Sequence, residues 1–396
     1  MPPLPKVLLV GGIDVDARLE LMRCLAGRYD IGALGSRAAL RHRFEAEKYG
    51  YATYTLSRGA NPFIDLFTLI QLLFVFCRMK PQLVHTFDTK PCVWGRIAAR
   101  LSGVPVVVGT IPGLGSLYTG DSRRRLLRSI YQRLQQLACH LSDLTIFQNH
   151  HDALQFVEAG VVSRRKTVII PGSGVSTELF DPARVPDTVR MALRAELGFG
   201  ADAVIITMVS RVIRSKGICE FGTAAQKVCG DYPEARFLLI GSEDTESLDR
   251  LTADDLRALK QAVTWPGSRR DIPAILAISD IFALPSAYRE GMPRVLLEAA
   301  SMGLPIVTTN SPGCSEVVED GVNGLLIPAG DAVALSQAIE CLIEQPELRQ
   351  RFGEMSRRRA VDRFDIRVIA AQTGAVYERL LAAALEPTTG LLRSAG

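Results

Sequence analysis

The sequence predicts an α/β protein made of two doubly wound, Rossmann-like domains. Its 396 residues are too many for one hydrophobic core to serve comfortably, and a hydrophobic content of 47% is enough to fill two cores. The first half alternates short apolar runs with longer amphipathic segments, a pattern typical of parallel strands connected by helices, and the second half repeats it. The expected strands are 6–12, 29–35, 51–57, 81–87, 104–111, 143–149 and 166–172, followed by 204–211, 235–241, 262–267, 281–286, 305–310 and 324–328.

We divide the chain into an N-terminal domain at 1–180, a second domain at 181–365, and a C-terminal helix and tail at 366–396. The polar, proline-bearing stretch 180–200 is the expected linker. The segment from Phe352 has a helical pattern and no following strand, so we expect it to pack as an appended helix pair. Ligands of open parallel sheets bind beyond the carboxyl ends of the strands, and we therefore expect the chemistry in a cleft between the two domains.

Composition argues against several classes of protein. The net charge of +4, from 46 basic and 42 acidic residues, does not indicate a nucleic-acid partner. The eight cysteines stand at no metal-ligand or redox spacing, which indicates buried thiols in a reducing compartment. No leader sequence can be laid out before the first apolar run, so we expect a cytoplasmic protein.

Two segments bear on membrane contact. The apolar stretch 62–77 falls short of the roughly 20 residues that a spanning helix needs, and we favour a core helix over insertion into a membrane surface. The segment 121–133 reads as a basic amphipathic helix, which is expected to lie on an anionic membrane surface; a solvated basic face is the alternative. Its membrane-facing arginines are Arg123, Arg124, Arg125 and Arg128.

Gly11 and Gly12 directly follow the first expected strand, where a residue without a side chain lets the backbone approach a ligand. An ordinary strand-to-helix turn is the alternative. The complete G-x-G-x-x-G fingerprint is absent, because Asp14 and Asp16 stand where later glycines would be, and a dehydrogenase is disfavoured.

The segment SRVIRSKG follows the first strand of the second domain and carries Arg211 and Lys216 to the end of that strand and the start of the next helix. Both cations could reach one diphosphate, although solvated charges at a helix end are the usual alternative.

The segment YREGMPRVLLEAASMGLPIVTTN places Glu290 before a turn and Glu298 inside the following helix, a spacing of E-x7-E. If Gly291, Met292 and Pro293 open this helix, backbone amides near Arg294 and Val295 point out of its end and can stabilise a departing diphosphate. Glu290 then faces a sugar. Glu298 can accept hydrogen bonds from a ribose diol, with a surface glutamate as the alternative.

The stretch 289–328 resembles the C-terminal signature of the family-four retaining glycosyltransferases, which have the GT-B fold of two Rossmann-like domains facing a cleft. SRVIRSKG resembles the donor-phosphate motif of that family, and WPGSRRDI resembles its nucleotide-base loop. The resemblance implies that Arg211 and Lys216 bind the diphosphate, Glu290 the donor sugar and Glu298 the ribose. It also implies that Arg269 and Arg270 lie near the base and that Gly12 approaches the donor from the other domain.

The stretch 85–119 is similar to family members that act on polyprenyl-diphosphate-linked saccharides, in which a Gly-Leu-Gly turn follows the corresponding strand. The resemblance thus implies an acceptor-binding turn at Gly113, Leu114, Gly115 and Ser116. His85 ends an apolar strand and is a candidate catalytic residue facing the cleft, with a structural histidine as the alternative. His150 and His151 lack ligand-spaced partners, and we attribute them to the start of a helix.

With what the resemblance implies, we expect an enzyme that transfers a hexose or N-acetylhexosamine from a nucleotide sugar, with a UDP-sugar as the expected donor, to a lipid-linked saccharide, with retention of configuration. Such a reaction belongs to glycan, O-antigen, capsule or exopolysaccharide assembly at the inner face of the cell membrane. We expect no metal and no other cofactor, because two cations and a helix amino terminus can neutralise the departing diphosphate. The alternatives are a GT-B-like nucleotide-sugar epimerase or hydrolase and a non-catalytic, nucleotide-binding membrane scaffold.

Overall fold

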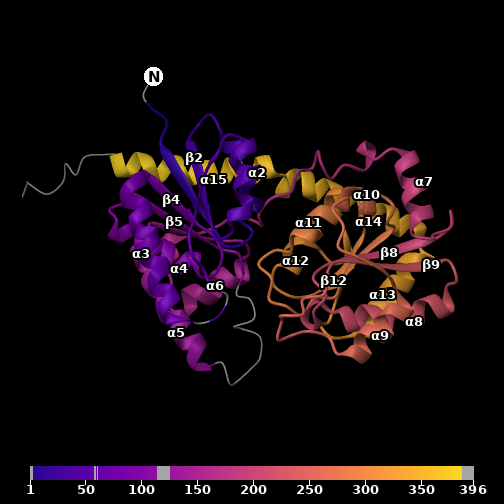
Figure 1. Ribbon diagram of the computed structural model, residues 1–396. Coiled ribbons are helices and arrows are strands. Elements are labelled where there is room, and N and C mark those ends of the chain that lie inside the picture. Colours follow the sequence, from indigo (N-terminus) through magenta and orange to yellow (C-terminus); the bar gives the residue numbers. More distant parts are fainter. Residues whose placement is uncertain (1–2, 58, 60, 114–124, 386–396) are drawn as a thin grey trace, which may run out of the picture. The chain divides into compact units, whose positions relative to one another are not determined.

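The computed structural model describes residues 3–57, 59, 61–113 and 125–385 of the chain. These residues form two compact units, each built on a parallel sheet (Figure 1). The first unit contains the chain up to Ile170 and again from Ile366, and the second contains Pro171–Asp365. Every segment expected to form a strand contains one, so the predicted fold class is confirmed.

Seven described strands make the sheet of the first unit, in the order β3-β2-β1-β4-β5-β6-β7 and with parallel pairing throughout. The strands are β1 (Lys6–Val10), β2 (Asp30–Gly35), β3 (Gly50–Thr53), β4 (Leu83–Thr86), β5 (Val106–Ile111), β6 (Leu144–Phe147) and β7 (Thr167–Ile169). The helices are α1 (Leu19–Leu25), α2 (Arg41–Ala46), α3 (Pro62–Met79), α4 (Pro91–Leu101), α5 (Arg125–Leu141), α6 (His150–Glu158) and α15 (Ile366–Leu385), with short helices η1 (Val15–Arg18), η2 (Ala38–Leu40) and η5 (Arg164–Lys166).

The two faces of the first sheet bury different helices, because successive side chains of a strand point to opposite faces. Leu9 of β1 and Leu83 of β4 pack in one core cluster with side chains of α1 and α15. Leu8 and Val84, one residue away, pack in a second cluster with α3 and α4. The helices therefore form a layer on each side of the sheet.

The C-terminal helix α15 is an integral part of the first unit. Its Tyr377 is fully buried, and the rings of Tyr29 and Tyr377 meet edge to face with centroids 5.7 Å apart. The hydroxyl of Tyr29 also donates to the carbonyl of Gly374 at 3.4 Å. The expected appended helix pair is wrong, because α14 (Pro346–Arg359) belongs to the second unit while α15 completes the core of the first.

Six described strands make the sheet of the second unit, in the order β10-β9-β8-β11-β12-β13. They are β8 (Val204–Val209), β9 (Ala235–Ile240), β10 (Thr264–Gly267), β11 (Ile281–Leu284), β12 (Ile306–Thr309) and β13 (Gly324–Ile327). Besides α14, the helices are α7 (Asp187–Glu196), α8 (Ile218–Asp231), α9 (Ala253–Ala262), α10 (Ile272–Ala277), α11 (Arg294–Ser301), α12 (Cys314–Val317) and α13 (Ala332–Glu344), with short helices η6 (Pro182–Arg184), η7 (Arg214–Lys216) and η8 (Ala360–Phe364).

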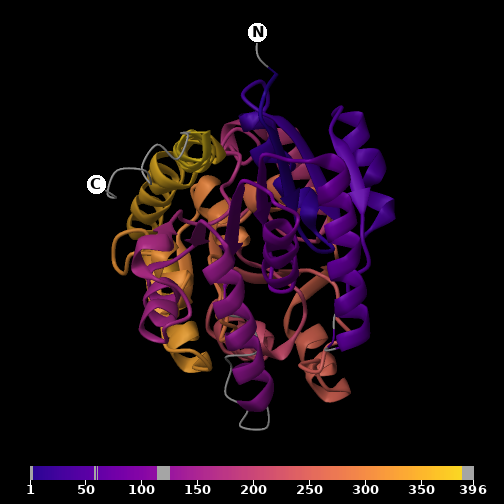
Figure 2. The ribbon, with the colours of Figure 1, turned by 90° about the vertical axis from the view of Figure 1, so that its left-hand side faces the viewer.

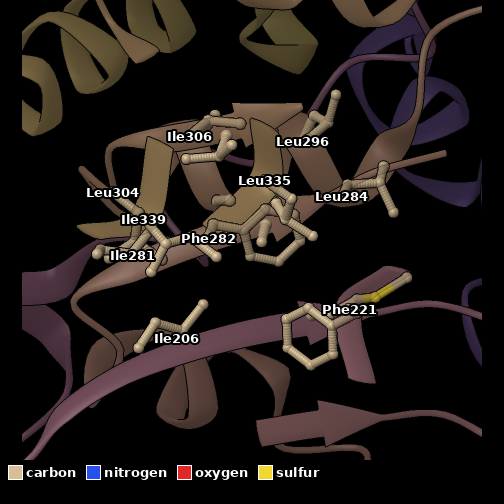
Figure 3. Packing of buried hydrophobic residues seen from close by; sticks show 14 of the residues in the cluster. Ile206, Phe221, Ile281, Phe282, Leu284, Leu296, Leu304, Ile306, Leu335 and Ile339 are labelled. Carbon is tan, nitrogen blue, oxygen red and sulfur yellow. The ribbon is translucent and has the colours of Figure 1, made fainter. Parts of the chain in front are cut away.

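The core of the second unit lies between this sheet and its covering helices. Figure 3 shows Ile206, Phe282 and Ile306 of the sheet close to Phe221 of α8 and Leu335 of α13. All five side chains are fully buried. Burial of this apolar surface fixes the strands whose carboxyl ends carry the predicted site.

The segment 180–200 is not a linker. Phe180 lies in the core of the second unit, and Leu193 of α7 packs with Phe199 and Ile275 in a satellite cluster. Arg194 of α7 donates hydrogen bonds to the carbonyls of Ala203 at 2.6 Å and Ile278 at 3.2 Å. The division between the units falls after Ile170 rather than after residue 180. The segment resembles a linker in sequence because it is polar and contains prolines, and because its few buried apolar residues are widely spaced.

Helix α3 is the one described helix that is long and apolar enough to cross a membrane by length and composition alone. Only 22% of it is buried. Thr68, Leu72 and Phe76 face the core, while Phe63, Phe67 and Phe74 are exposed. The expectation of a core helix is therefore wrong for one whole face of α3.

Replacing Tyr377 with alanine is expected to destabilise the first unit by about 3–5 kcal/mol, as loss of a buried aromatic side chain does. The two tryptophans allow each unit to be followed separately, since Trp94 lies in the first unit and Trp265 in the second. In single-tryptophan backgrounds, urea should unfold the Trp94 unit at a lower concentration while the Trp265 transition stays in place. Leu385→Ala, an 80% exposed position on the same helix, is the control. Equal shifts of both transitions would contradict the assignment of α15.

Candidate functional site

Each sheet has one place where its strand order reverses. In the first sheet this place lies between β1 and β4, and in the second it lies between β8 and β11. At such a point the chain leaves the two neighbouring strands toward opposite faces, so the carboxyl ends of the strands remain open to a ligand. The predicted site residues follow these four strands or their neighbours.

The loop after β8 is tightly folded against the loop after β11. Gly217 has a φ of 80°, and a Cβ at this position would overlap the carbonyl oxygen of Pro285. The carbonyl of Ser215 accepts hydrogen bonds from the amides of Ala287 at 2.8 Å and Tyr288 at 3.0 Å. Only glycine combines this positive φ with this close approach. The backbone of this loop therefore requires the glycine that follows Lys216.

Lys216 and Glu290 form the centre of this arrangement. Their ammonium and carboxylate groups are ion-paired, and their side chains are only 13% and 15% exposed. The Lys216 Nζ also lies 5.2 Å from the centre of the Tyr288 ring. Two opposite charges that the sequence separates by more than seventy residues thus share one half-buried place at the reversal point. A ligand phosphate there would compete with Glu290 for the ammonium.

Arg211 lies at the same edge but in a more open position. Its side chain is exposed and its Nη1 lies 3.0 Å from Asp244 Oδ2. Arg211 and Lys216 both lie in the loop after β8, and Lys216 meets Glu290, whereas the partner of Arg211 is Asp244, which the sequence reading missed.

Helix α11 begins at Arg294, and Pro293 is its N-cap with φ −64° and ψ 119° rather than a residue of its first turn. The amides of Arg294 and Val295 occupy the first turn, as expected, where α-helical amides have no acceptor within the helix. Met292 differs from the prediction, because its side chain is buried in the core. Gly291 packs against the turn at Gly313, where a Cβ would overlap the Gly291 carbonyl oxygen.

Glu298 lies on the second turn of α11, where it is 13% exposed. The Nε of Arg294 donates to Glu298 Oε1 at 3.1 Å, an i,i+4 pair along the helix. Arg294 therefore orients the carboxylate that was expected to bind ribose.

Arg269 and Arg270 follow β10, the edge strand of the second sheet, at the carboxyl side. Arg269 is bound by the protein's own acids: it pairs with Glu196 of α7, and its Nε and Nη2 bond Asp271 at 2.9 and 2.6 Å. The hydrogen bonds from Arg269 lower the pKa of Asp271. Arg269 thus holds the loop in shape, while Arg270 is exposed at its tip.

The reversal point of the first sheet contains Gly12 and an acid that sequence reasoning did not select. The amide of Gly12 donates to Asp88 Oδ2 at 2.8 Å. Asp88 follows β4 and has a φ of 67°, a strained conformation for a residue with a side chain and one that is often found at functional sites. Burial raises the pKa of Asp88, and the nearby Asp14 raises it further. The signal in the sequence was an acid directly after a buried strand.

His85 is a buried structural residue, and its expected role as a cleft-facing catalytic group is wrong. Its ring is 1% exposed, and both nitrogens are engaged: Nδ1 lies 2.6 Å from the Tyr377 hydroxyl and Nε2 lies 2.7 Å from the Thr110 hydroxyl. Burial lowers the pKa of His85 well below its ordinary value, and Arg18 and Arg96 lower it further. The sequence could not show that α15 covers this face of β4.

The predicted acceptor turn and the predicted basic helix lie partly outside the described residues. Gly113 follows β5 at the carboxyl edge of the first sheet, whereas Leu114, Gly115, Ser116, Arg123 and Arg124 lie outside the described residues. Arg125 and Arg128 belong to the first turn of α5, and nothing is described of their side chains. His150 and His151 begin α6 after the N-cap Asn149, whose side chain accepts from the amide of Asp152.

The chain is similar in sequence to known glycosyltransferases. A model of the "Glycosyl transferase 4-like domain" matches residues 11–172, and a model of "Glycosyl transferases group 1" matches residues 189–359. Among curated proteins, an Escherichia coli UDP-Gal:alpha-D-GlcNAc-diphosphoundecaprenol alpha-1,3-galactosyltransferase is 31% identical over 72% of this chain and 72% of its own. A Campylobacter jejuni N,N'-diacetylbacillosaminyl-diphospho-undecaprenol alpha-1,3-N-acetylgalactosaminyltransferase is 28% identical over 83% of this chain and 85% of its own.

Solved structures show the same fold. Anabaena HepE in complex with UDP and glucose superposes with a TM-score of 0.76 at 22% identity, covering 95% of this chain and 100% of its own. Sucrose-phosphate synthase from Thermosynechococcus elongatus superposes with a TM-score of 0.77 at 21% identity, covering 96% and 100%.

Two Rossmann-like units, with a Lys-Glu pair at the reversal point of the second, define a glycosyltransferase of the GT-B class. This chain belongs to the family of group 1 and 4-like glycosyltransferases.

The environment of His85 predicts a pH dependence of stability. The folded state disfavours the protonated ring, so the unfolded chain takes up this proton first as the pH falls below about 6.5. The free energy of unfolding of the first unit should therefore decrease toward acid, at a slope approaching about 1.4 kcal/mol per pH unit. In His85→Gln this part of the slope between pH 6.5 and 5.5 should vanish, as measured by urea unfolding followed at Trp94. An unchanged slope would contradict the buried neutral imidazole.

Proposed function

We propose that this glycosyltransferase moves a hexose or N-acetylhexosamine from a UDP-sugar to a saccharide linked to a polyprenyl diphosphate, with retention of anomeric configuration. The observation that carries the proposal is the half-buried Lys216–Glu290 pair at the reversal point of the second sheet, with Glu298 on the adjoining helix. The names of the two curated relatives support the acceptor class, since both act on diphospho-undecaprenol-linked sugars, and the E. coli relative uses UDP-Gal.

The residues of the second unit divide the work on the donor. Lys216 and Arg211 supply the positive charge for the departing diphosphate, together with the amides at the start of α11, so catalysis proceeds without a metal. When Lys216 turns to the phosphate, the Glu290 carboxylate becomes available to the sugar hydroxyls and orients the ring. Glu298, held by Arg294, accepts hydrogen bonds from the ribose, and the loop at Arg269 and Arg270 lies toward the base.

The bond that breaks joins the anomeric carbon to the diphosphate oxygen. Stabilising the leaving group allows oxocarbenium character to build at that carbon, and the acceptor hydroxyl attacks on the face that the diphosphate leaves. The hydroxyl proton passes to the departing phosphate oxygen. The acceptor sugar binds at the carboxyl edge of the first unit, at Asp88, whose carboxylate also holds the amide of Gly12, the residue expected to approach the donor. Donors of this kind are cytoplasmic and the acceptor is anchored in a bilayer, so the enzyme works at the inner face of the cell membrane.

The donor class is tested by calorimetry of UDP, GDP and ADP with and without magnesium. Selective binding of UDP that does not depend on magnesium is the expected result. Binding of none of the three would contradict the donor site, and transfer that needs magnesium would contradict the charge arrangement. An epimerase or hydrolase would instead form product without an acceptor.

Glu290→Gln should lower kcat by about a hundredfold with little change in UDP affinity, because the charge acts on the sugar rather than on the nucleotide. Lys216→Ala should also weaken UDP binding, by about ten- to a hundredfold, which corresponds to one lost charge-assisted hydrogen bond. Lys227→Ala is the matched control, since Lys227 and Glu340 form an ion pair of 2.5 Å between α8 and α13. Full turnover by Glu290→Gln would refute the assigned role.

Asp88→Asn should separate charge from structure at the acceptor edge. Asparagine tolerates a positive φ and keeps an oxygen that can accept from the Gly12 amide, so the fold should be preserved. We expect the acceptor kcat/KM to fall at least tenfold, with UDP affinity unchanged. Asp30→Asn, exposed at the amino end of β2, is the control. Equal kinetics for Asp88→Asn and the parent enzyme would show that the Asp88 carboxylate only stabilises the loop and does not act on the acceptor.

A further inference from the structure

One face of α3 carries an uninterrupted row of exposed apolar side chains, here called the α3 stripe. Its members are Phe63 (85% exposed), Leu66 (55%), Phe67 (51%), Ile70 (53%) and Phe74 (67%). Their spacing of three, four and seven residues places them along one side of the helix. Cys77 continues the row, and no charged residue interrupts it. Every phenylalanine that is exposed among the described residues lies in this stripe.

Two polar residues in the middle of α3, Thr68 and Gln71, form hydrogen bonds within the protein. The hydroxyl of Thr68 donates to the Thr55 carbonyl at 2.6 Å, and Gln71 Oε1 accepts from the Thr55 amide at 2.7 Å. Leu72 and Phe76 are buried against the sheet and α4. The inner face therefore fixes α3 to the protein. The helix cannot leave to span a membrane without opening this core, and it can only lie along a surface.

The stripe begins near the edge of the first unit that we propose binds the acceptor. Asn61 caps α3 by accepting from the Ile64 amide at 3.2 Å. Asp65, in the first turn, pairs with Lys90 Nζ at 2.6 Å, and Lys90 follows Asp88 by two residues. The same ammonium donates to the hydroxyl of Ser57 at 2.9 Å and to the carbonyl of Gly59 at 2.7 Å. One lysine thus connects the start of the apolar row to the acceptor edge.

Basic residues lie at one end of the stripe. Arg78 and Lys80 are exposed at the far end of α3. Helix α5 packs on the same helix α4 as α3 does, and it exposes Ile130, Leu137 and Arg133. Figure 2 views the molecule from the side on which α3, α4 and α5 lie in Figure 1. An apolar row of about 17 Å with cations at its end fits a bilayer of anionic lipids, in which rings enter the acyl boundary and cations meet headgroups.

We propose that the α3 stripe is a membrane-docking surface that lies in the interface of an anionic bilayer and brings the acceptor edge of the first unit to the headgroup level. The inference rests on the proposed lipid-linked acceptor and names how that acceptor is reached. A saccharide joined through a diphosphate to a bilayer lipid projects only a short way from the surface. The proximity of the stripe to Asp88 lets such a substrate enter while its lipid stays in the membrane.

The test is flotation of the full chain with vesicles of phosphatidylglycerol and phosphatidylethanolamine. The variant Phe67→Ser/Phe74→Ser removes two exposed rings and should fold as the parent does, which a thermal melt checks. We expect each ring to change the partition coefficient by about tenfold, and the pair by about a hundredfold. Leu154→Ser, a 54% exposed apolar position on α6, should float as the parent does. Equal flotation of parent and double variant overturns the proposal.

Two further arms separate the possible causes of failure. Sedimentation without lipid tests whether the stripe instead joins two copies of the chain. If the parent is a dimer that does not float and the double variant is a monomer, the proposal is overturned. Transfer is measured on acceptor in vesicles and on acceptor dispersed in detergent. The double variant should lose at least tenfold on vesicles and little in detergent, with unchanged UDP affinity. A parent that floats but transfers no sugar refutes the proposed function and leaves the docking surface standing.

Discussion

The structure depends on one topological constraint, which both units obey. Parallel strands joined by right-handed crossovers must be connected over one face of the sheet or the other. In each unit the first strands are added toward one edge of the sheet and the later strands toward the opposite edge. Where the direction changes, two neighbouring strands release their loops to opposite sides. The loops that follow β8 and β11 therefore meet at this point, while the side chains of both strands remain in a close-packed core. The site is a consequence of the order in which the strands are laid down.

Electrostatics then determines what this opening can bind. In the second unit the loops after β8 and β11 bring Lys216 and Glu290 together in a place where both are largely shielded from water. Partial burial makes each charge costly alone and tolerable as a pair. In the function that we propose, the donor diphosphate replaces Glu290 as the partner of the lysine, and the glutamate binds the sugar hydroxyls. The ion pair thus holds in place the two groups that we propose act on the donor. Backbone contacts at Gly217 and Gly313, which leave no room for a side chain, keep the neighbouring loops in position.

The first unit is completed by both ends of the chain. Tyr377, on the last described helix, fills the core against Tyr29 and shares a hydrogen bond with His85. The unit therefore cannot reach its final packing until the second unit has been synthesised. Its two faces serve different purposes: the α15 face is sealed with aromatic side chains, whereas the α3 helix on the other face buries one side and leaves the α3 stripe uncovered.

The sequence by itself determined the strands and the doubly wound class, because these depend on local patterns of alternating apolar runs and turns. It also singled out Lys216 and Glu290, which the structure brings together. Long-range packing decided the rest. Only the tertiary structure showed that His85 is enclosed by a helix almost three hundred residues away, that Met292 faces the core, and that Arg269 is bound by Glu196. It also made α3 an exposed surface, since an apolar helix of this length has the same composition whether its second face meets a protein core or a membrane.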